Sequence, residues 1–184
     1  MTTLTPVRVG VSLEALLAAK DSRAARQADW LAHYQQPVIS LTLVTPGVVK
    51  DCIRYRNTMG VALRACDQLL WQHRWNVLDR QVLWLPTGAE ALWCVAQPAV
   101  EIKACCVDME ETHPLGRLWG FDVFCPDNGQ VGRHSLNLNS LNLNSRRCLV
   151  CDESAHGCAR SRCHPVEDVV GRVERLIDVW FARD

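Results

Sequence analysis

The residues of this 184-residue chain best suited to chemistry lie between positions 113 and 123. Residues 113–117 form a loop that contains Gly116, and a short β-strand carrying Asp122 follows. A glycine-bearing loop lets the backbone approach phosphate, and a strand carboxylate can hold Mg²⁺. The stretch therefore favours metal-assisted phosphoryl or nucleotidyl transfer.

Three neighbouring side chains are further candidates for this chemistry, each with a structural alternative. Arg117 could hold two phosphate oxygens and neutralise a leaving diphosphate, or form a surface salt bridge. His113 could orient or deprotonate an attacking hydroxyl, or cap the end of a helix. Glu110 could join Asp122 as a second Mg²⁺ ligand, or belong to a solvated helix end. The spacing does not decide between these roles.

A second group of chemically capable residues follows in the pattern Cys148-x₂-Cys151-x₆-Cys158-x₅-His164. Three thiolates and an imidazole suit a tetrahedral Zn²⁺ site, and the first spacing is typical of one. The alternative is a set of reduced, partly buried thiols, as in many cytosolic proteins. Both interpretations stay open from the sequence.

The densest group of basic residues surrounds these cysteines. It consists of Arg146, Arg147, Arg160 and Arg162. Such a group suits a polyphosphate substrate or an acidic protein partner, and the alternative is a solvated basic loop. Lys50 is expected in a loop beyond a strand end, after the break at Pro46-Gly47.

Composition restricts the class of protein. Lys and Arg number 20 and Asp and Glu number 20, so the net charge gives no reason to expect nucleic acid as a partner. No stretch approaches the roughly 20 apolar residues of a membrane span. The N-terminus lacks the pattern of a secretory signal, so the ten cysteines are expected to be reduced. We expect a soluble cytoplasmic protein with no membrane association.

Hydrophobic periodicity and turn signals predict helices, strands and a hairpin in alternation. We expect helices over about 13–34, 57–73 and 98–113 and from Pro165 onward, strands over 38–44 and 121–125, and a hairpin of 81–85 with 91–95. This order predicts an α+β fold: one domain over residues 1–184, with a small mixed sheet, flanking helices and 146–164 as a Cys- and Arg-rich subregion. A tandem Ser-Leu-Asn-Leu-Asn copy within 135–144 is expected to be a surface insertion.

Two of these segments also resemble a known enzyme family. The stretch His113-Pro114-Leu115-Gly116-Arg117-Leu118-Trp119 with Asp122-Val123, and the later block Arg146-Arg147-Cys148-Leu149-Val150-Cys151, resemble the apo-citrate lyase phosphoribosyl-dephospho-CoA transferases, or holo-citrate lyase synthases. Cys158-Ala159-Arg160-Ser161-Arg162 with His164 extends the similarity toward the C-terminus, and 11–17, 23–27 and 40–50 extend it toward the N-terminus.

The resemblance implies transfer of the triphosphoribosyl-dephospho-CoA prosthetic group to a serine of the citrate lyase acyl carrier subunit, with release of diphosphate. By the same resemblance, Asp122 would hold Mg²⁺ against the triphosphate. Gly116 and Arg117 would contact phosphate, with Lys50 and the four arginines as further contacts. Catalysis would rest on positioning and charge neutralisation, in a fold that could be nucleotidyltransferase-like.

One residue departs from the family pattern. The family typically has Asp-x-Asp where this chain has Gly120-Phe121-Asp122. Positions 120 and 122 share one face of a strand, so the pair could hold metal side by side, and Gly120 removes one of the two carboxylates. The sequence predicts a weakened enzyme that Gly120→Asp would improve. The alternative is a non-catalytic module that binds the carrier protein.

Overall fold

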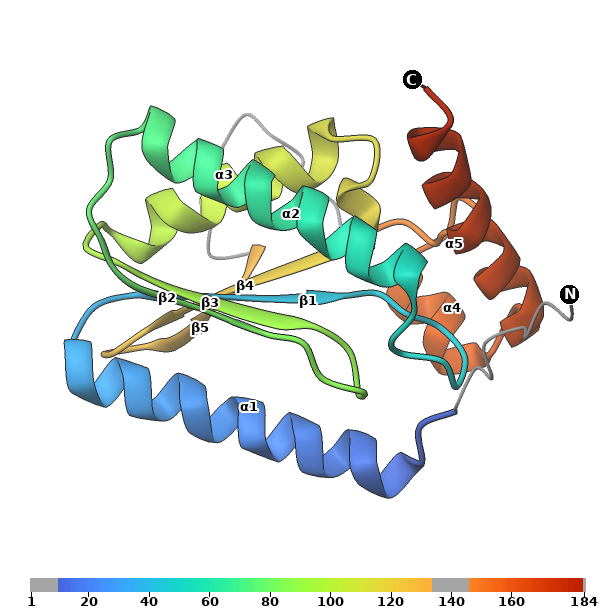
Figure 1. Cartoon of the computed structure of the whole chain (residues 1–184), viewed down its shortest axis with the longest axis horizontal. Coiled ribbons are helices and arrows are strands. Elements are labelled where there is room, and N and C mark those ends of the chain that lie inside the picture. The colour runs from blue at the N-terminus through green and yellow to red at the C-terminus, as the bar shows by residue number, and fades with distance from the viewer. Residues whose placement is uncertain (1–9, 134–145, 184) are drawn as a thin grey trace, which may run out of the picture.

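An antiparallel sheet of five strands organises the computed structural model, which describes residues 10–133 and 146–183 (Figure 1). The strands are β1 Val38–Leu43, β2 Val77–Leu83, β3 Glu90–Val95, β4 Trp119–Cys125 and β5 Gly129–Val131, in the spatial order β2-β3-β1-β4-β5. The α+β class is confirmed, but the expected mixed sheet is wrong. The reason is that β1 lies between two hairpins, β2–β3 and β4–β5, and runs antiparallel to its neighbour in each.

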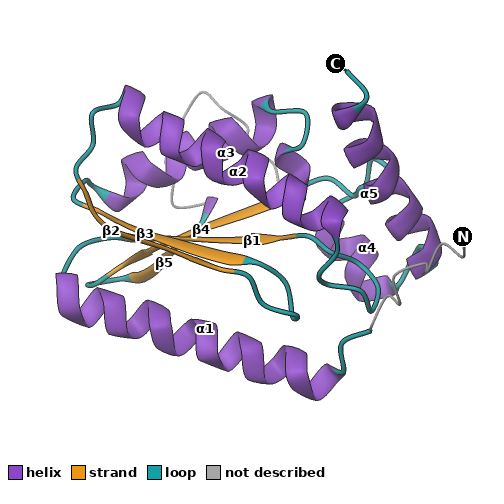
Figure 2. Cartoon of the chain, viewed as in Figure 1, coloured by secondary structure: helices purple, strands orange, loops and turns teal. Residues whose placement is uncertain are grey.

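One face of the sheet carries the apolar core. Ile39, Leu41, Trp93 and Phe121 point to this face and are fully buried. Helices α2 (Ile53–Gln72) and α3 (Ala99–Thr112) cover it, with α5 (Val166–Phe181) at one end (Figure 2). Burial of these side chains is the main stabilising contribution to the fold.

Among the described elements, α1 (Leu13–Tyr34) covers the opposite face, and it has no buried residue. Polar contacts hold this helix to the sheet: Gln27 donates to the Ser40 hydroxyl at 2.8 Å, and the Tyr34 hydroxyl donates to Asp79 at 2.6 Å. The α1 side of the sheet therefore combines these polar contacts with the buried apolar side chains of Val38, Leu92 and Cys94.

Most predicted elements are confirmed, with shifted ends. The hairpin of β2 and β3 forms as expected, and α5 follows Pro165. Helix α2 begins at Ile53 rather than near Asn57, because the buried Tyr55 anchors an additional first turn. The structure adds the short α4 (Ala155–Ser161) and β5, which pairs with β4 across a turn at 126–128.

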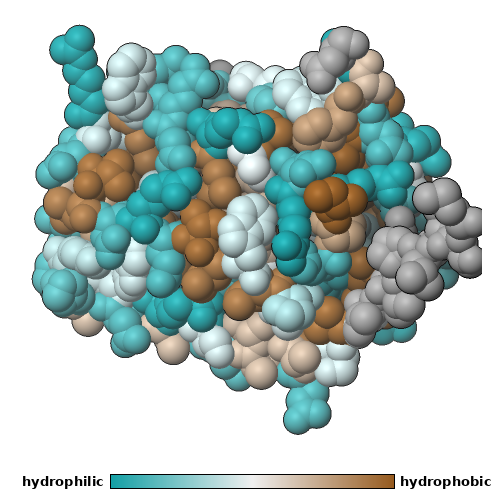
Figure 3. All heavy atoms as spheres, in the orientation of Figure 1, coloured by the Kyte–Doolittle hydropathy of each residue, from teal (hydrophilic) through white to brown (hydrophobic). Residues whose placement is uncertain are grey.

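None of the described helices is long and apolar enough to cross a membrane. On the face seen in Figure 3, hydrophobic and hydrophilic residues are interspersed. The predicted Ser-Leu-Asn-Leu-Asn insertion falls at 135–144, outside the described residues.

Candidate functional site: an arginine pocket beside a cysteine cluster

The loop after α3 turns tightly against the end of that helix. The 3₁₀ turn Gly116–Leu118 brings Gly116 so close to α3 that a β-carbon there would lie 2.1 Å from the carbonyl oxygen of Glu110. No side chain fits in that space, so the position requires glycine. The tight turn places Arg117 just before the first residue of β4.

Arg117 joins the two segments that the sequence singled out. Its guanidinium donates to the carbonyl oxygen of Arg147 at 2.6 Å and to that of Cys148. The residues are 30 and 31 positions apart in the chain. Arg117 therefore acts as a bridge between the loop and the cysteine-containing segment.

Around this bridge lies a cavity of about 360 Å³, which we call the arginine pocket. Gly116, Val44 and Leu149 form part of its wall. Its charged lining consists of Arg117, Arg133, Arg146, Arg147, Glu110 and Glu111. Four arginines against two glutamates leave a surplus of positive charge, which suits an anionic ligand.

Glu110 is buried at the base of this pocket, with only 3% of its surface exposed. Its carboxylate accepts hydrogen bonds from Arg133 and Arg146, each at 2.5 Å or close to it, and from the backbone N–H of Phe121 at 2.8 Å. Lys103 donates to the carbonyl of Phe121 at 2.6 Å. Glu110 and Lys103 thus satisfy the backbone N–H and carbonyl of Phe121, which β5 is too short to pair. Glu110 also orients two arginines.

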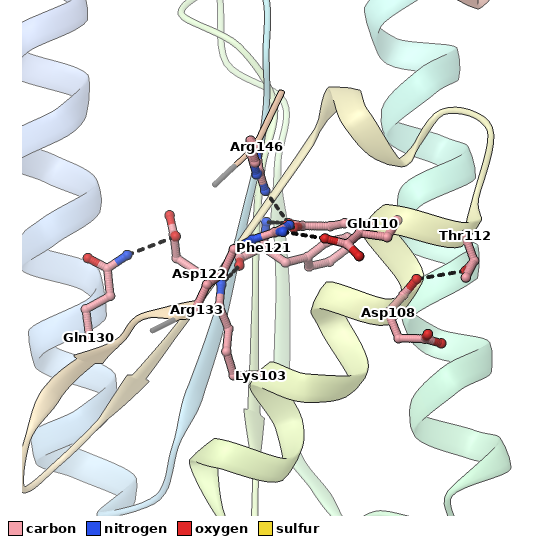
Figure 4. Close-up of polar contacts among 10 residues, drawn as sticks. Lys103, Asp108, Glu110, Thr112, Phe121, Asp122, Gln130, Arg133 and Arg146 are labelled. Carbon is pink, nitrogen blue, oxygen red and sulfur yellow. Dashed lines mark hydrogen bonds and ion pairs between the residues drawn. The ribbon is translucent and has the colours of Figure 1, made fainter. Parts of the chain in front are cut away.

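The two carboxylates predicted to share Mg²⁺ do not face each other. Figure 4 shows Asp122 and Glu110 pointing to opposite sides of β4. Asp122 accepts a hydrogen bond from the Gln130 side chain at 2.9 Å on the α1 side. Their separation follows from the pleat: Asp122 points to the face opposite Phe121, while Glu110 approaches from α3.

Gly120 lies on the same face as Asp122, as predicted. Residue 120 pairs with Thr42 of β1, and a β-carbon there would be 3.3 Å from the carbonyl and hydroxyl oxygens of Thr42. A larger side chain can therefore be accommodated only if Thr42 shifts by a few tenths of an ångström.

His113 is not part of the arginine pocket. Its ring packs between Trp119, at 4.3 Å between centroids, and Trp180, at 4.7 Å. The Nδ1 atom accepts a hydrogen bond from the backbone N–H of Leu115 at 3.0 Å, and burial lowers the pKa of the imidazole. The structure places His113 at the end of α3, where it faces α2 and α5 and lines a separate cavity of about 480 Å³ with Arg64 and Trp180.

Lys50 lines a separate cavity of about 190 Å³, which we call the α1-side cavity. Its ammonium donates to the carbonyl of Thr45, and burial lowers its pKa. The same cavity contains Glu90, whose buried carboxylate accepts from Arg23 at 3.0 Å and from Arg26. The structure therefore places Lys50 away from the four arginines of the arginine pocket.

The predicted metal ligands do come together. One ligand atom from each of Cys148, Cys151, Cys158 and His164 lies within 4.8 Å of the others. The Sγ atoms of Cys151 and Cys158 are 3.5 Å apart, and Nε2 of His164 is 3.2 Å from Sγ of Cys151. We call these four residues the Cys₃His cluster.

The environment of this cluster favours a thiolate at Cys148. Burial alone would raise the pKa of its thiol. Hydrogen bonds from the backbone amides of Val150 and Cys151, and from the thiols of Cys158 and Cys151, instead lower that pKa to about 6. A thiolate is the form that binds a metal ion. The group could therefore hold a metal. Arg160 and Arg162, which the sequence predicted as phosphate contacts, lie close to it in the chain, but both are exposed and neither lines the arginine pocket.

Comparison with known proteins identifies the family to which this chain belongs. A sequence model described as apo-citrate lyase phosphoribosyl-dephospho-CoA transferase matches residues 11–180. The chain belongs to this family. A curated protein of that name from Escherichia coli O9:H4 (strain HS) is 36% identical over 168 residues, covering 91% of this chain and 89% of the relative. Another from Shigella flexneri serotype 5b (strain 8401) is 36% identical with the same coverage, and one from Escherichia coli O1:K1 / APEC is 34% identical.

The predicted membership of this transferase family, and with it the predicted enzyme class, is thus confirmed. The matched range includes the arginine pocket, the α1-side cavity and the Cys₃His cluster. Sequence reasoning missed two arrangements within it. Arg133 approaches Glu110 across 23 positions, and Glu90 binds Arg23 across 67. No local spacing could reveal either pair, because each depends on how the sheet places distant segments.

Proposed function

We propose that this chain transfers the phosphoribosyl-dephospho-CoA group to apo-citrate lyase, with the polyphosphate of the precursor held in the arginine pocket. The proposal is carried by one observation: Gly116, Arg117, Arg146 and Arg147, selected from sequence as phosphate contacts, line a single cavity. Arginine suits this role because its planar guanidinium can hold two phosphate oxygens at once.

In the proposed reaction, a serine hydroxyl of the citrate lyase acyl carrier subunit attacks the phosphorus nearest the ribose. A new oxygen–phosphorus bond forms, the bond to diphosphate breaks, and the serine proton passes to a base. The surplus positive charge of the pocket would stabilise the charge that develops on diphosphate as it leaves. Arg147 is the most available of its arginines: it is 65% exposed, and its guanidinium is 3.9 Å from Asp152.

We assign the Mg²⁺ role to Asp122 rather than to Glu110. The Glu110 carboxylate already binds two arginines and a backbone N–H, which leaves it poorly suited to a hydrated ion. Asp122 accepts a hydrogen bond from the neutral side-chain amide of Gln130, which a metal ion can displace. Because Asp122 faces α1 and the arginine pocket lies on the other side of β4, the ion would neutralise charge on a part of the precursor that lies outside the pocket.

The proposal also covers a zinc ion, the type of fold, the location of the protein in the cell and further phosphate contacts. We propose Zn²⁺ for the Cys₃His cluster, because thiolate and imidazole are its preferred ligands. A nucleotidyltransferase-like arrangement and a cytoplasmic location complete the proposal. Lys50, in the α1-side cavity, and the exposed Arg160 and Arg162 remain proposed phosphate contacts outside the arginine pocket.

Intact-mass spectrometry of the apo acyl carrier subunit tests the function. The subunit is incubated with this protein, triphosphoribosyl-dephospho-CoA and Mg²⁺. We expect a mass gain equal to the precursor minus diphosphate. Arg147→Ala should slow the gain by about tenfold or more, because a charge-assisted hydrogen bond is lost. Arg175→Ala, which removes an exposed arginine on α5, is the matched control and should leave the rate unchanged.

The outcomes separate the proposal from its alternative. Equal slowing by both variants would mean that general surface charge, not the pocket, attracts the substrate. No gain with the parent chain but a gain with Gly120→Asp would identify a weakened enzyme. No gain with either chain, together with binding of the carrier subunit, would favour the non-catalytic module.

A further inference from the structure

Residues 146–164, which we call the cysteine module, have almost no apolar core of their own. Their buried residues are Cys148 and Cys158, both members of the Cys₃His cluster. The single helix of the module, α4, is seven residues long and buries Cys158 alone. A segment this small cannot bury enough apolar surface to hold one conformation, and such segments usually depend on a disulfide or a metal.

A disulfide does not account for the order of the module. The Sγ atoms of Cys151 and Cys158 are 3.5 Å apart, well beyond the roughly 2.05 Å of a disulfide bond. A tetrahedral ion about 2.3 Å from each sulfur holds its sulfurs about 3.8 Å apart. The observed separation, with all four ligand atoms within 4.8 Å, therefore fits one ion after a small outward shift.

The backbone of the module continues directly into the wall of the arginine pocket. The N–H of Cys148 donates to the carbonyl of Glu153 at 2.7 Å, and the N–H of Ala155 donates to the carbonyl of Arg146 at 2.8 Å. These bonds fold the ligand Cys148 and the pocket arginines Arg146 and Arg147 into one short ribbon. Any force that fixes Cys148 therefore fixes its neighbour Arg147.

Three hydrogen bonds on the pocket side link the module to the rest of the fold. Arg117 donates to the carbonyls of Arg147 and Cys148, and Arg146 reaches the buried carboxylate of Glu110. The ribbon is thus held from the pocket side by charged side chains. On its other side, the Cys₃His cluster lies at the position where a metal ion would hold it.

We infer that a zinc ion bound by Cys148, Cys151, Cys158 and His164 is a clamp that positions Arg146 and Arg147 in the arginine pocket. The ion takes no part in the chemistry; its ligands hold the wall that contacts the phosphates. The consequence for phosphate binding rests on the proposed function, whereas the zinc-dependent order of residues 146–155 does not.

The test compares the full-length protein with two serine variants. Cys151→Ser removes a ligand, and Cys163→Ser removes an exposed thiol outside the cluster as the matched control. Zinc is counted by mass spectrometry of the metal, and hydrogen exchange is followed at the amides of Cys148 and Ala155. Isothermal titration calorimetry with inorganic triphosphate measures the pocket.

We expect one zinc ion per chain in the parent protein and in Cys163→Ser. Cys151→Ser should lose the ion, exchange its Cys148 and Ala155 amides faster, and bind triphosphate about tenfold more weakly. Amides of β1 and β3 should keep their protection, which shows that the rest of the fold is intact. If the variant does not fold, chelation of zinc from the folded parent protein, followed by zinc add-back, gives the same comparison.

Two results would overturn the clamp: a parent protein without zinc, or loss of zinc with exchange at 146–155 unchanged. Loss of zinc that speeds exchange but leaves triphosphate affinity unchanged would overturn the link to the pocket. If the zinc-loaded parent does not bind triphosphate at all, the proposed phosphate site fails. Zinc content and exchange would in that case still decide the clamp.

Discussion

Two buried glutamates, one on each side of the sheet, each bind a pair of arginines. Glu90 on the α1 side accepts from Arg23 and Arg26, and both belong to one helix. Glu110 on the α3 side accepts from Arg133 and Arg146. Each glutamate is 3% exposed, so each carboxylate needs its partners to offset the cost of burial.

The difference between the two sites lies in what surrounds the pairs. Glu90 attaches α1 to the sheet, and its cavity contains three basic and two acidic side chains. Glu110 also accepts the Phe121 N–H, and its pocket has four arginines against two glutamates. The same ion-pair chemistry thus fastens a helix on one side and orients a basic surface on the other. The α1-side cavity has a surplus of one basic side chain and the arginine pocket a surplus of two, so the two sites differ in the degree of positive charge beside the buried pair.

The largest expected effect is a difference in the free energy of unfolding that is lost when each glutamate is replaced by glutamine. Glu110→Gln should lower the free energy of unfolding by about 4 kcal/mol, because two arginines and a backbone N–H lose a charged acceptor. Glu90→Gln should cost about 2 kcal/mol, because the arginines of both glutamates are partly exposed to water but Glu110 additionally accepts the buried Phe121 N–H. Urea denaturation measures both. An equal loss would contradict the distinction drawn between the sites.

The next effect concerns chemistry on the α1 side. Gly120→Asp should raise the transfer rate at saturating Mg²⁺ by about tenfold, or roughly 1.4 kcal/mol, by restoring a carboxylate beside Asp122. Gly120→Ala is the matched control, because its β-carbon meets the same Thr42 oxygens at 3.3 Å without adding a ligand. Single-turnover kinetics measure both variants. If alanine accelerates transfer as much as aspartate does, packing rather than metal binding is responsible.

The smallest effect concerns His113, which lies on the α3 side but outside the pocket. Burial lowers its pKa below 6.5, so the unfolded chain binds the proton more readily than the folded chain. The free energy of unfolding should therefore fall as the pH drops below about 6.5, and His113→Phe should remove part of that fall.

Thermal unfolding from pH 7.5 to 5 measures this pH dependence, with the exposed His33→Gln variant as the control. Transfer by His113→Phe, assayed at pH 7.5, should be nearly unchanged, as expected of a residue in a structural position. A pH-dependent loss of transfer rate with unchanged stability would instead return His113 to the catalytic role predicted from its sequence.

The local features of this protein follow from its sequence because short-range forces produce them. Apolar periodicity placed α1 and α5, and a Pro- and Gly-containing turn placed the β2–β3 hairpin. The four residues of the Cys₃His cluster lie within 17 positions of the chain, so a short segment can bring them together and the sequence could predict the cluster. Gly116 stood out for the same reason, since its close contact with Glu110 depends on a turn only a few residues long.

Tertiary structure alone decided which distant charges meet. Glu110 pairs with Arg133 and Arg146 and does not share a metal site with Asp122. This outcome depends on the antiparallel register of β4. Alternation along that strand turns Asp122 toward α1 while Glu110 approaches the other side. Such pairings have no local signature, because a one-residue change of register would exchange the two faces.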